Sequence, residues 1–229
     1  MKIFVIHYKK LHDRKKDMIA QFEKFNFTNY EFIERYDRHT LTSEDKQNFE
    51  EGYKPCQIAI TLSHLHAYKE IVEKYQGALI LEDDAILHDN FIELFNSYID
   101  QLPFNFDMFF IGHGCNLHIP QENIKPDCNV YEQQETRCTD SYVITKKSAQ
   151  KIINYFNCMD YKINAPVDFW LNTVFKDLNL DVYWAEPHIV VQGTMVGKYT
   201  SSHLYEGAYS MEGAYSMEGL YEGAYTEEG

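Results

Sequence analysis

ALILEDDAIL, residues 78–87, is the stretch that decides the fold. It begins as an apolar run typical of a strand buried in a sheet, and it continues into three successive carboxylates, Glu82, Asp83 and Asp84. Unpaired charges are rarely buried, so the strand is predicted over Ala78–Glu82, with its carboxyl end at the surface. Side chains alternate along a strand, and the spacing therefore predicts that Glu82 and Asp84 point one way and Asp83 the other.

Strand-like runs and helix-like periodicity alternate on both sides of this stretch. This alternation is typical of an α/β layer fold, in which helices cover the faces of a sheet. Further strands are predicted at Lys2–His7, Tyr30–Glu34, Asp107–Ile111, Ser141–Thr145, Asp181–Trp184 and Ile189–Val191.

Amphipathic helices are predicted between the strands. Asp13 is the expected N-cap of the first helix, and a later helix is predicted from Gln57 to Tyr75, with Gly77 as its C-cap. Residues 112–127 contain two glycines and two prolines without clear periodicity, so this segment is predicted to be a long surface loop.

Composition and charge narrow the classes of function. The chain has 229 residues, 45% hydrophobic and 15% aromatic, which indicates a folded domain with an aromatic-rich core. A net charge of −14 argues against binding to nucleic acid or to anionic lipid, because both partners require clustered Lys and Arg. Five cysteines without a CxxC pair favour a reducing compartment. The opening residues contain no signal peptide or membrane span, so a cytoplasmic location is expected.

The last residues have a different composition. From Leu204 the chain repeats LYEG, AYSMEG, AYSMEG, LYEG and AYTEEG, without any Lys or Arg. Residues 1–203 are therefore predicted to form the domain, and residues 204–229 a flexible acidic tail. The alternative is an interaction tag that mediates assembly through its spaced tyrosines.

The carboxylates at the end of the 78–82 strand suit a metal site. In open α/β sheets, ligands bind beyond the carboxyl ends of the strands. A hard cation, Mn²⁺ or Mg²⁺, would be held there by carboxylate oxygens and by a substrate diphosphate. The alternative is a solvated strand end that starts a turn.

Seven segments of the chain, in the same order, resemble glycosyltransferase family 25, which includes procollagen and lipooligosaccharide galactosyltransferases. The resemblance runs from the first strand to about His203. The matching segments are FVIHYKKLHDR (4–14), LSHLHAYKEI (62–71), ALILEDDA (78–85), DMFFIGHG (107–114), DSYVITKKSAQKI (140–152), APVDFWL (165–171) and WAEPHIVVQ (184–192).

The resemblance implies a single-domain GT-A-like fold with a mixed central sheet flanked by helices. It also implies an inverting, metal-dependent transfer of a hexose, with galactose favoured, from a UDP-sugar to a hydroxyl acceptor on collagen-like hydroxylysine or a glycan. Two departures concern the donor site. The chain has His7 and Tyr8 where the family usually has Asn-Leu, and residues 56–61 replace the family's usual Gly-Glu-x-Gly-Cys run.

The resemblance and the residue chemistry together suggest roles for individual side chains. Asp168 is the expected general base, and its alternative role is to favour the positive end of a helix. Glu82, Asp84 and His203 are the expected metal ligands, although with ten histidines in the chain a chance match at His203 is the alternative.

Arg14 is a candidate phosphate clamp or a surface helix residue. The candidate donor-binding residues are His7, Tyr8, Arg14, Ser63, His64 and Asp83; for Ser63 and His64 the alternative is core packing.

Two other classes of function compete with glycosyl transfer. A metal-dependent hydrolase of phosphoesters or nucleotide-sugars would also use carboxylates at a strand end, but a two-metal site would need more ligands. A non-catalytic assembly module would have no need for both the EDD and the PVD segments. Nothing in the sequence identifies the acceptor.

Overall fold

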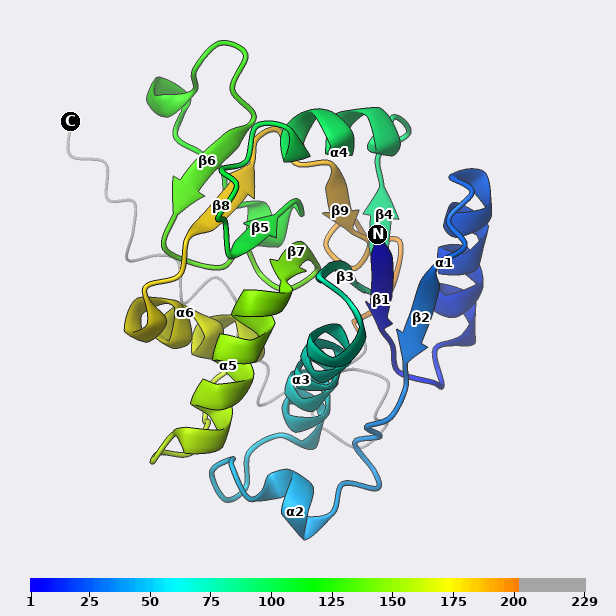
Figure 1. Cartoon of the computed structure of the whole chain (residues 1–229). Coiled ribbons are helices and arrows are strands. Elements are labelled where there is room, and N and C mark those ends of the chain that lie inside the picture. The colour runs from blue at the N-terminus through cyan, green and yellow to red at the C-terminus, as the bar shows by residue number, and fades with distance from the viewer. Residues whose placement is uncertain (202–229) are drawn as a thin grey trace, which may run out of the picture. The chain divides into compact units, whose positions relative to one another are not determined.

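The computed structural model describes residues 1–201, shown in Figure 1. The sequence expectations for His203 and for the tail over 204–229 lie outside these residues. Residues Met1–Tyr199 form one compact unit. Within the described part of the chain, no helix combines the length and the apolar character needed to cross a lipid bilayer.

A seven-stranded sheet forms the centre, in the order β2-β1-β3-β7-β5-β8-β6, and a two-stranded sheet pairs β4 with β9. The strands are β1 (Lys2–Ile6), β2 (Tyr30–Ile33), β3 (Gly77–Glu82), β4 (Ala85–Leu87), β5 (Met108–Phe110), β6 (Val130–Gln133), β7 (Ser141–Thr145), β8 (Val182–Ala185) and β9 (Val190–Gln192). β1 pairs in parallel with β2 and β3, whereas β7 is antiparallel to both β3 and β5. The sheet is therefore mixed and the fold is α/β, as predicted.

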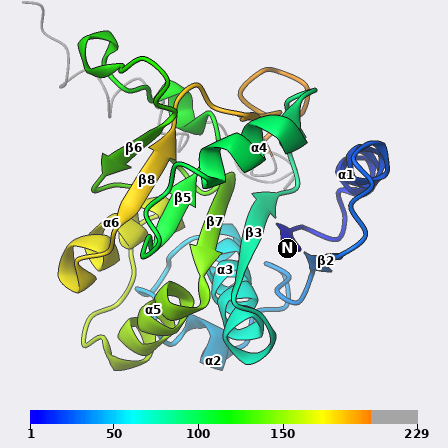
Figure 2. The same ribbon diagram turned by 45° about the horizontal axis from the view of Figure 1, so that its top comes forward.

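Helices cover both faces of the sheet, as Figures 1 and 2 show. The helices are α1 (His12–Lys24), α2 (Ser43–Lys46), α3 (Pro55–Lys74), α4 (Phe91–Ile99), α5 (Lys146–Cys158) and α6 (Val167–Leu178), with 3-10 turns η1 (Gly114–Asn116) and η2 (Gln121–Asn123). Strand alternation divides the core between the two faces. Ala78 and Ile80 of β3 pack with α3, α5 and α6, while Leu79 and Leu81 pack with α1 and α4.

Three local expectations were wrong. The first helix begins at His12 behind Leu11, so Asp13 lies in its first turn rather than at the N-cap. The long helix ends at Lys74, and Gly77 opens β3 because a Cβ there would lie 2.9 Å from the carbonyl oxygen of Ile144 on the neighbouring strand. β3 ends at Glu82 as predicted, but the chain then turns, and Asp83 and Asp84 are buried at 6% and 3% exposure instead of lying at the surface.

Candidate functional site

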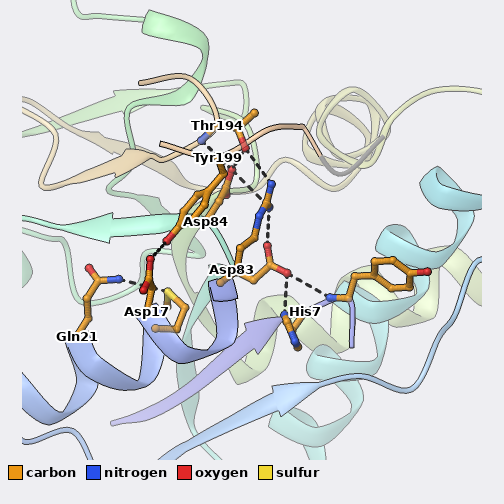
Figure 3. Close-up of polar contacts among 10 residues, drawn as sticks. His7, Asp17, Gln21, Asp83, Asp84, Thr194 and Tyr199 are labelled. Carbon is orange, nitrogen blue, oxygen red and sulfur yellow. Dashed lines mark hydrogen bonds and ion pairs between the residues drawn. The ribbon is translucent and has the colours of Figure 1, made fainter. Parts of the chain in front are cut away.

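Asp83 is held by the residues that follow β1 and begin α1, as Figure 3 shows. Its Oδ2 lies 2.8 Å from His7 Nδ1 and accepts the Tyr8 backbone N–H at 3.2 Å. Arg14 Nη1 donates to Oδ1 at 2.8 Å. Four of the six residues predicted to bind the donor, His7, Tyr8, Arg14 and Asp83, thus meet at one point, whereas Ser63 and His64 lie in α3. Both carboxylate oxygens of Asp83 are used within the protein.

Asp84 faces the segment that follows β9. Its Oδ2 accepts the Thr194 backbone N–H at 3.2 Å and the Thr194 hydroxyl, and it lies 3.9 Å from Arg14 Nη1. Its Oδ1 is buried and has no hydrogen-bond partner among the described residues. Burial and the charge of Glu82 raise the pKa of Asp84 to about 6, although Thr194 and Arg14 act in the opposite direction.

Asp140, directly before β7, is a third carboxylate of the site. Its side chain is 1% exposed; Ser141 Oγ donates to its Oδ2 at 2.9 Å, and its Oδ1 has no partner among the described residues. Burial raises its pKa well above the usual range, and the charges of Glu82 and Asp84 act in the same direction. Gly112 lies against it, since a Cβ at that position would be 1.9 Å from Asp140 Oδ2.

Glu82 links these carboxylates to helix α3. Thr139 Oγ1 donates to Glu82 Oε1 at 2.8 Å, and His64 Nε2 lies 3.6 Å from the same oxygen. His64 Nδ1 contacts the Tyr142 hydroxyl at 2.7 Å, so the imidazole is fixed between the sheet and the carboxylate. Ser63, its neighbour, donates its hydroxyl to the Ala59 carbonyl at 2.8 Å within α3.

Asp168 lies in the first turn of α6. Burial is the main cause of its raised pKa, the Phe169 backbone N–H lowers it, and the charge of Glu82 raises it further. Its charge also raises the pKa of Tyr53, whose buried hydroxyl has no partner among the described residues. Asp168 is therefore within electrostatic range of both Glu82 and Tyr53.

We refer to Glu82, Asp84, Asp140 and Asp168 as the carboxylate cluster. Its members come from β3 and the turn after it, from the start of β7, and from α6. Burial raises the pKa values of Asp84, Asp140 and Asp168, and the charge of Glu82 raises all three further. The free Oδ1 atoms of Asp84 and Asp140 are oxygen ligands of the kind that Mn²⁺ and Mg²⁺ prefer. Their oxygens are donors of the chemical type that suits a hard divalent cation, although in this structure no three of these carboxylates bring ligand atoms within 4.8 Å of one another.

Sequence reasoning did not predict Asp140 as a metal ligand, and it missed Thr194 as part of this site. Asp140 differs from an ordinary strand-start aspartate only in following a segment that brings it beside Glu82. Thr194 is 110 residues from its partner Asp84, and no local pattern signals such a contact. The order of the strands places β7 beside β3, and this neighbourhood is the feature that would have indicated Asp140.

Two solved structures are similar to this chain at low identity. The glycosyltransferase involved in glycosylation of the major capsid of PBCV-1 matches with a TM-score of 0.48 and 14% identity, over 83% of this chain and 92% of that chain. The beta-1,4-galactosyltransferase 7 of Drosophila, in a complex with manganese, UDP-Gal and xylobiose, matches with a TM-score of 0.46 and 10% identity, over 96% of this chain and 78% of that chain. Likenesses at this level leave the chemistry of the chain open.

Two relatives come from Acanthamoeba polyphaga mimivirus. Its procollagen lysyl hydroxylase and glycosyltransferase is 24% identical over 173 residues, which are 66% of this chain and 19% of the relative. A second mimivirus protein, named provisionally as a glycosyltransferase, is 31% identical over 124 residues, or 51% of this chain and 38% of that protein. The chain thus spans well under half the length of the curated relatives it matches.

A family model also matches the chain. Glycosyltransferase family 25 (LPS biosynthesis protein) aligns with residues 1–171. The aligned region contains β1, β3 and β7, and with them Glu82, Asp84, Asp140 and Asp168. Since the match covers well over half of its length, the chain belongs to glycosyltransferase family 25.

Proposed function

We propose that this chain is the catalytic domain of an inverting glycosyltransferase that uses a divalent cation and a UDP-sugar donor, with galactose as the favoured hexose. The acceptor is a hydroxyl group on a glycan or on a collagen-like hydroxylysine. One observation carries the proposal: Asp84 and Asp140 each have a buried carboxylate oxygen, near Glu82, for which residues 1–201 supply no hydrogen-bond partner. Such oxygens are costly unless a ligand satisfies them.

The cation would be held by Glu82 and Asp84, with Asp140 as a further ligand and His203 as the ligand expected from outside the described residues. A bound Mn²⁺ or Mg²⁺ ion would neutralise negative charge on the departing diphosphate. Arg14 and Asp83 hold the turn after β3 in place, because their ion pair ties that turn to α1. Rigid placement of the ligands is what such a site requires.

Asp168 is proposed as the general base. Its carboxylate takes the proton from the acceptor hydroxyl as the acceptor oxygen attacks the anomeric carbon of the sugar. The bond between that carbon and the UDP oxygen breaks, and the electron pair leaves with UDP. A raised pKa suits this role, since a carboxyl with a higher pKa is the stronger base. His64 and Tyr142 hold the Glu82 side of the site by their hydrogen-bonded contact.

The test is UDP release from UDP-galactose, UDP-glucose and UDP-N-acetylglucosamine, with and without Mn²⁺, in the presence and absence of a panel of hydroxyl acceptors. We expect release that depends on Mn²⁺ and on the acceptor, and that is highest for UDP-galactose. Release that is equally fast without any acceptor would instead indicate a nucleotide-sugar hydrolase. If calorimetry detected no binding of any of these nucleotide-sugars, with or without Mn²⁺, that result would contradict enzymatic function.

A further inference from the structure

A second group of metal-binding side chains lies outside the carboxylate cluster. One ligand atom each from His118, Glu186 and His188 lies within 4.8 Å of the others. His118 follows η1 in the segment after β5, whereas Glu186 and His188 lie in the connection between β8 and β9. A third imidazole, His113, packs against this group, with ring centroids 5.0 Å from His188 and 6.5 Å from His118.

The hydrogen bonds of Glu186 leave one oxygen facing the histidines. Its Oε2 accepts from Arg137 Nη2 at 3.0 Å and from the Ile119 backbone N–H at 3.2 Å. Its Oε1 lies 3.2 Å from His118 Nδ1. Arg137 thus neutralises the carboxylate on one side, and the other side remains available.

Both ring nitrogens of His118 have polar neighbours. Its Nδ1 lies 3.2 Å from Glu186 Oε1 and 3.4 Å from Arg137 Nη2, and its Nε2 lies 3.2 Å from Asn116 Oδ1. Neutral His118 with its proton on Nε2 donates to Asn116 and directs the Nδ1 lone pair toward Glu186; with the proton on Nδ1 it donates to Glu186 instead. A cation bound between Nδ1 and Oε1 would take the place of that proton.

The other two imidazoles have unsatisfied nitrogens. His113 Nδ1 and His188 Nδ1 are buried and have no hydrogen-bond partner among the described residues. A buried polar atom without a partner carries a desolvation cost that a coordinated metal removes. His113 and His188 therefore each have a ring nitrogen without a partner among the described residues, beside the contact between His118 and Glu186.

We infer that His118, Glu186 and His188 form a second cation site, specific for Zn²⁺ or a similar borderline metal and distinct from the carboxylate cluster, with His113 or water as the fourth ligand. Imidazole nitrogen with one carboxylate oxygen is a donor set suited to Zn²⁺, whereas Mn²⁺ and Mg²⁺ prefer oxygen alone. Arg137 offsets the negative charge of Glu186 through their ion pair. This favours Zn²⁺ further, because Mn²⁺ and Mg²⁺ depend more than Zn²⁺ on the net negative charge of their ligands.

Occupation of this site would tie the segment after β5 to the β8–β9 connection. Gly112 already forms an isolated bridge with Val190, and it lies against Asp140 of the carboxylate cluster. His113 is the next residue along the chain. A metal held here fixes the backbone beside Asp140 and so acts as a structural ion, whatever reaction the carboxylate cluster performs.

The test is metal uptake by the untagged full chain after removal of metals with a chelator. Co²⁺ replaces Zn²⁺ in such sites, and its visible absorption reports nitrogen ligation at low coordination number. We expect one equivalent of Co²⁺ in the wild-type chain, displaced by Zn²⁺ and not by Mg²⁺. His188→Ala should weaken Co²⁺ binding by at least the 10–100-fold that even supporting contacts contribute.

Two variants serve as controls. His88→Ala removes an exposed histidine, and Asp84→Asn alters the carboxylate cluster; both should retain the Co²⁺ spectrum. His118→Ala, at a side chain that is 43% exposed, provides the same test if His188→Ala fails to fold. No Co²⁺ uptake by the wild-type chain would overturn the inference. So would uptake that survives both histidine variants, or that Asp84→Asn abolishes.

Discussion

Asp84→Asn should make the metal-free protein more stable at neutral pH, although it removes a proposed metal ligand. The substitution keeps the shape of the side chain and removes its charge. Thr194 still finds an acceptor in the amide oxygen, and the amide nitrogen takes the position of the unpartnered Oδ1. What is lost is the repulsion from Glu82 and the cost of burying a charge at a side chain that is 3% exposed.

The magnitude follows from the pKa of Asp84, which rises from 3.8 to about 6 on folding. Because the folded-state pKa is the higher one, the folded protein holds the proton more tightly. Its stabilising contribution is complete below about pH 3.8 and is lost as pH rises through 6. At 1.36 kcal/mol per pKa unit, the ionised side chain costs about 3 kcal/mol at pH 7.5. For a domain of this size that corresponds to roughly 6–12 °C in Tm.

Thermal unfolding in EDTA measures this effect. At pH 7.5 we expect a Tm for Asp84→Asn that is roughly 6–12 °C above the wild type, with the gap narrowing at pH 5. Added Mn²⁺ should raise the wild-type Tm more than that of the variant, because ligand binding to the native state stabilises it. Asp89→Asn is the matched control, at a carboxylate that is 88% exposed, and should change little. A lower Tm for Asp84→Asn in EDTA at pH 7.5 would refute the reasoning.

Three further changes test other parts of the site. Asp83→Asn, next to Asp84 in sequence, should have the opposite effect and destabilise the protein by about 3–5 kcal/mol in urea unfolding, because the buried Arg14 loses its nearer carboxylate, at 2.8 Å, and retains Asp84 at 3.9 Å; an unchanged midpoint would contradict the structural role. Asp168→Asn should lower the single-turnover rate of sugar transfer by about 10²–10⁴-fold, while the affinity for UDP measured by calorimetry changes little. If the rate and the affinity fell together, Asp168 would be a donor-site or structural residue. Removal of residues 204–229 should leave the melting temperature and UDP binding intact, since the repeats lack aliphatic runs; a large drop in Tm would show that the tail contributes to the fold.

The parts of the fold that could be predicted from the sequence are those set by local chemistry. The apolar run before Glu82 predicts a buried strand because nothing else accommodates such residues. The positions of Gly77 and Asp13 were misjudged for one shared reason. A glycine can end a helix or allow a close strand contact, and the choice depends on Ile144, which lies far along the chain. Asp13 likewise suits a helix start in general, but the turn after β1 determines where α1 begins.

In the candidate site, too, local chemistry predicts some residues, and the others depend on parts of the chain that are distant in sequence. Glu82 and Asp84 stand out because consecutive carboxylates after an apolar strand conflict with burial. Asp140 has no such conflict in its own neighbourhood; its burial beside Glu82 comes from the antiparallel pairing of β3 with β7. The opposite direction of Asp83 was predicted from the spacing, but its ion pair with Arg14 was not, since Arg14 is distant in sequence.

The contact between Thr194 and Asp84 has a consequence for how the protein is made. The two residues are 110 positions apart, and Tyr199 reaches back 182 positions to Asp17 on α1. A ribosome has therefore synthesised nearly all of residues 1–201 before Asp84 gains its partner on the segment after β9. Until then the nascent chain lacks both contacts, so the closure of this side of the site is completed only after the segment that follows β9 has been synthesised.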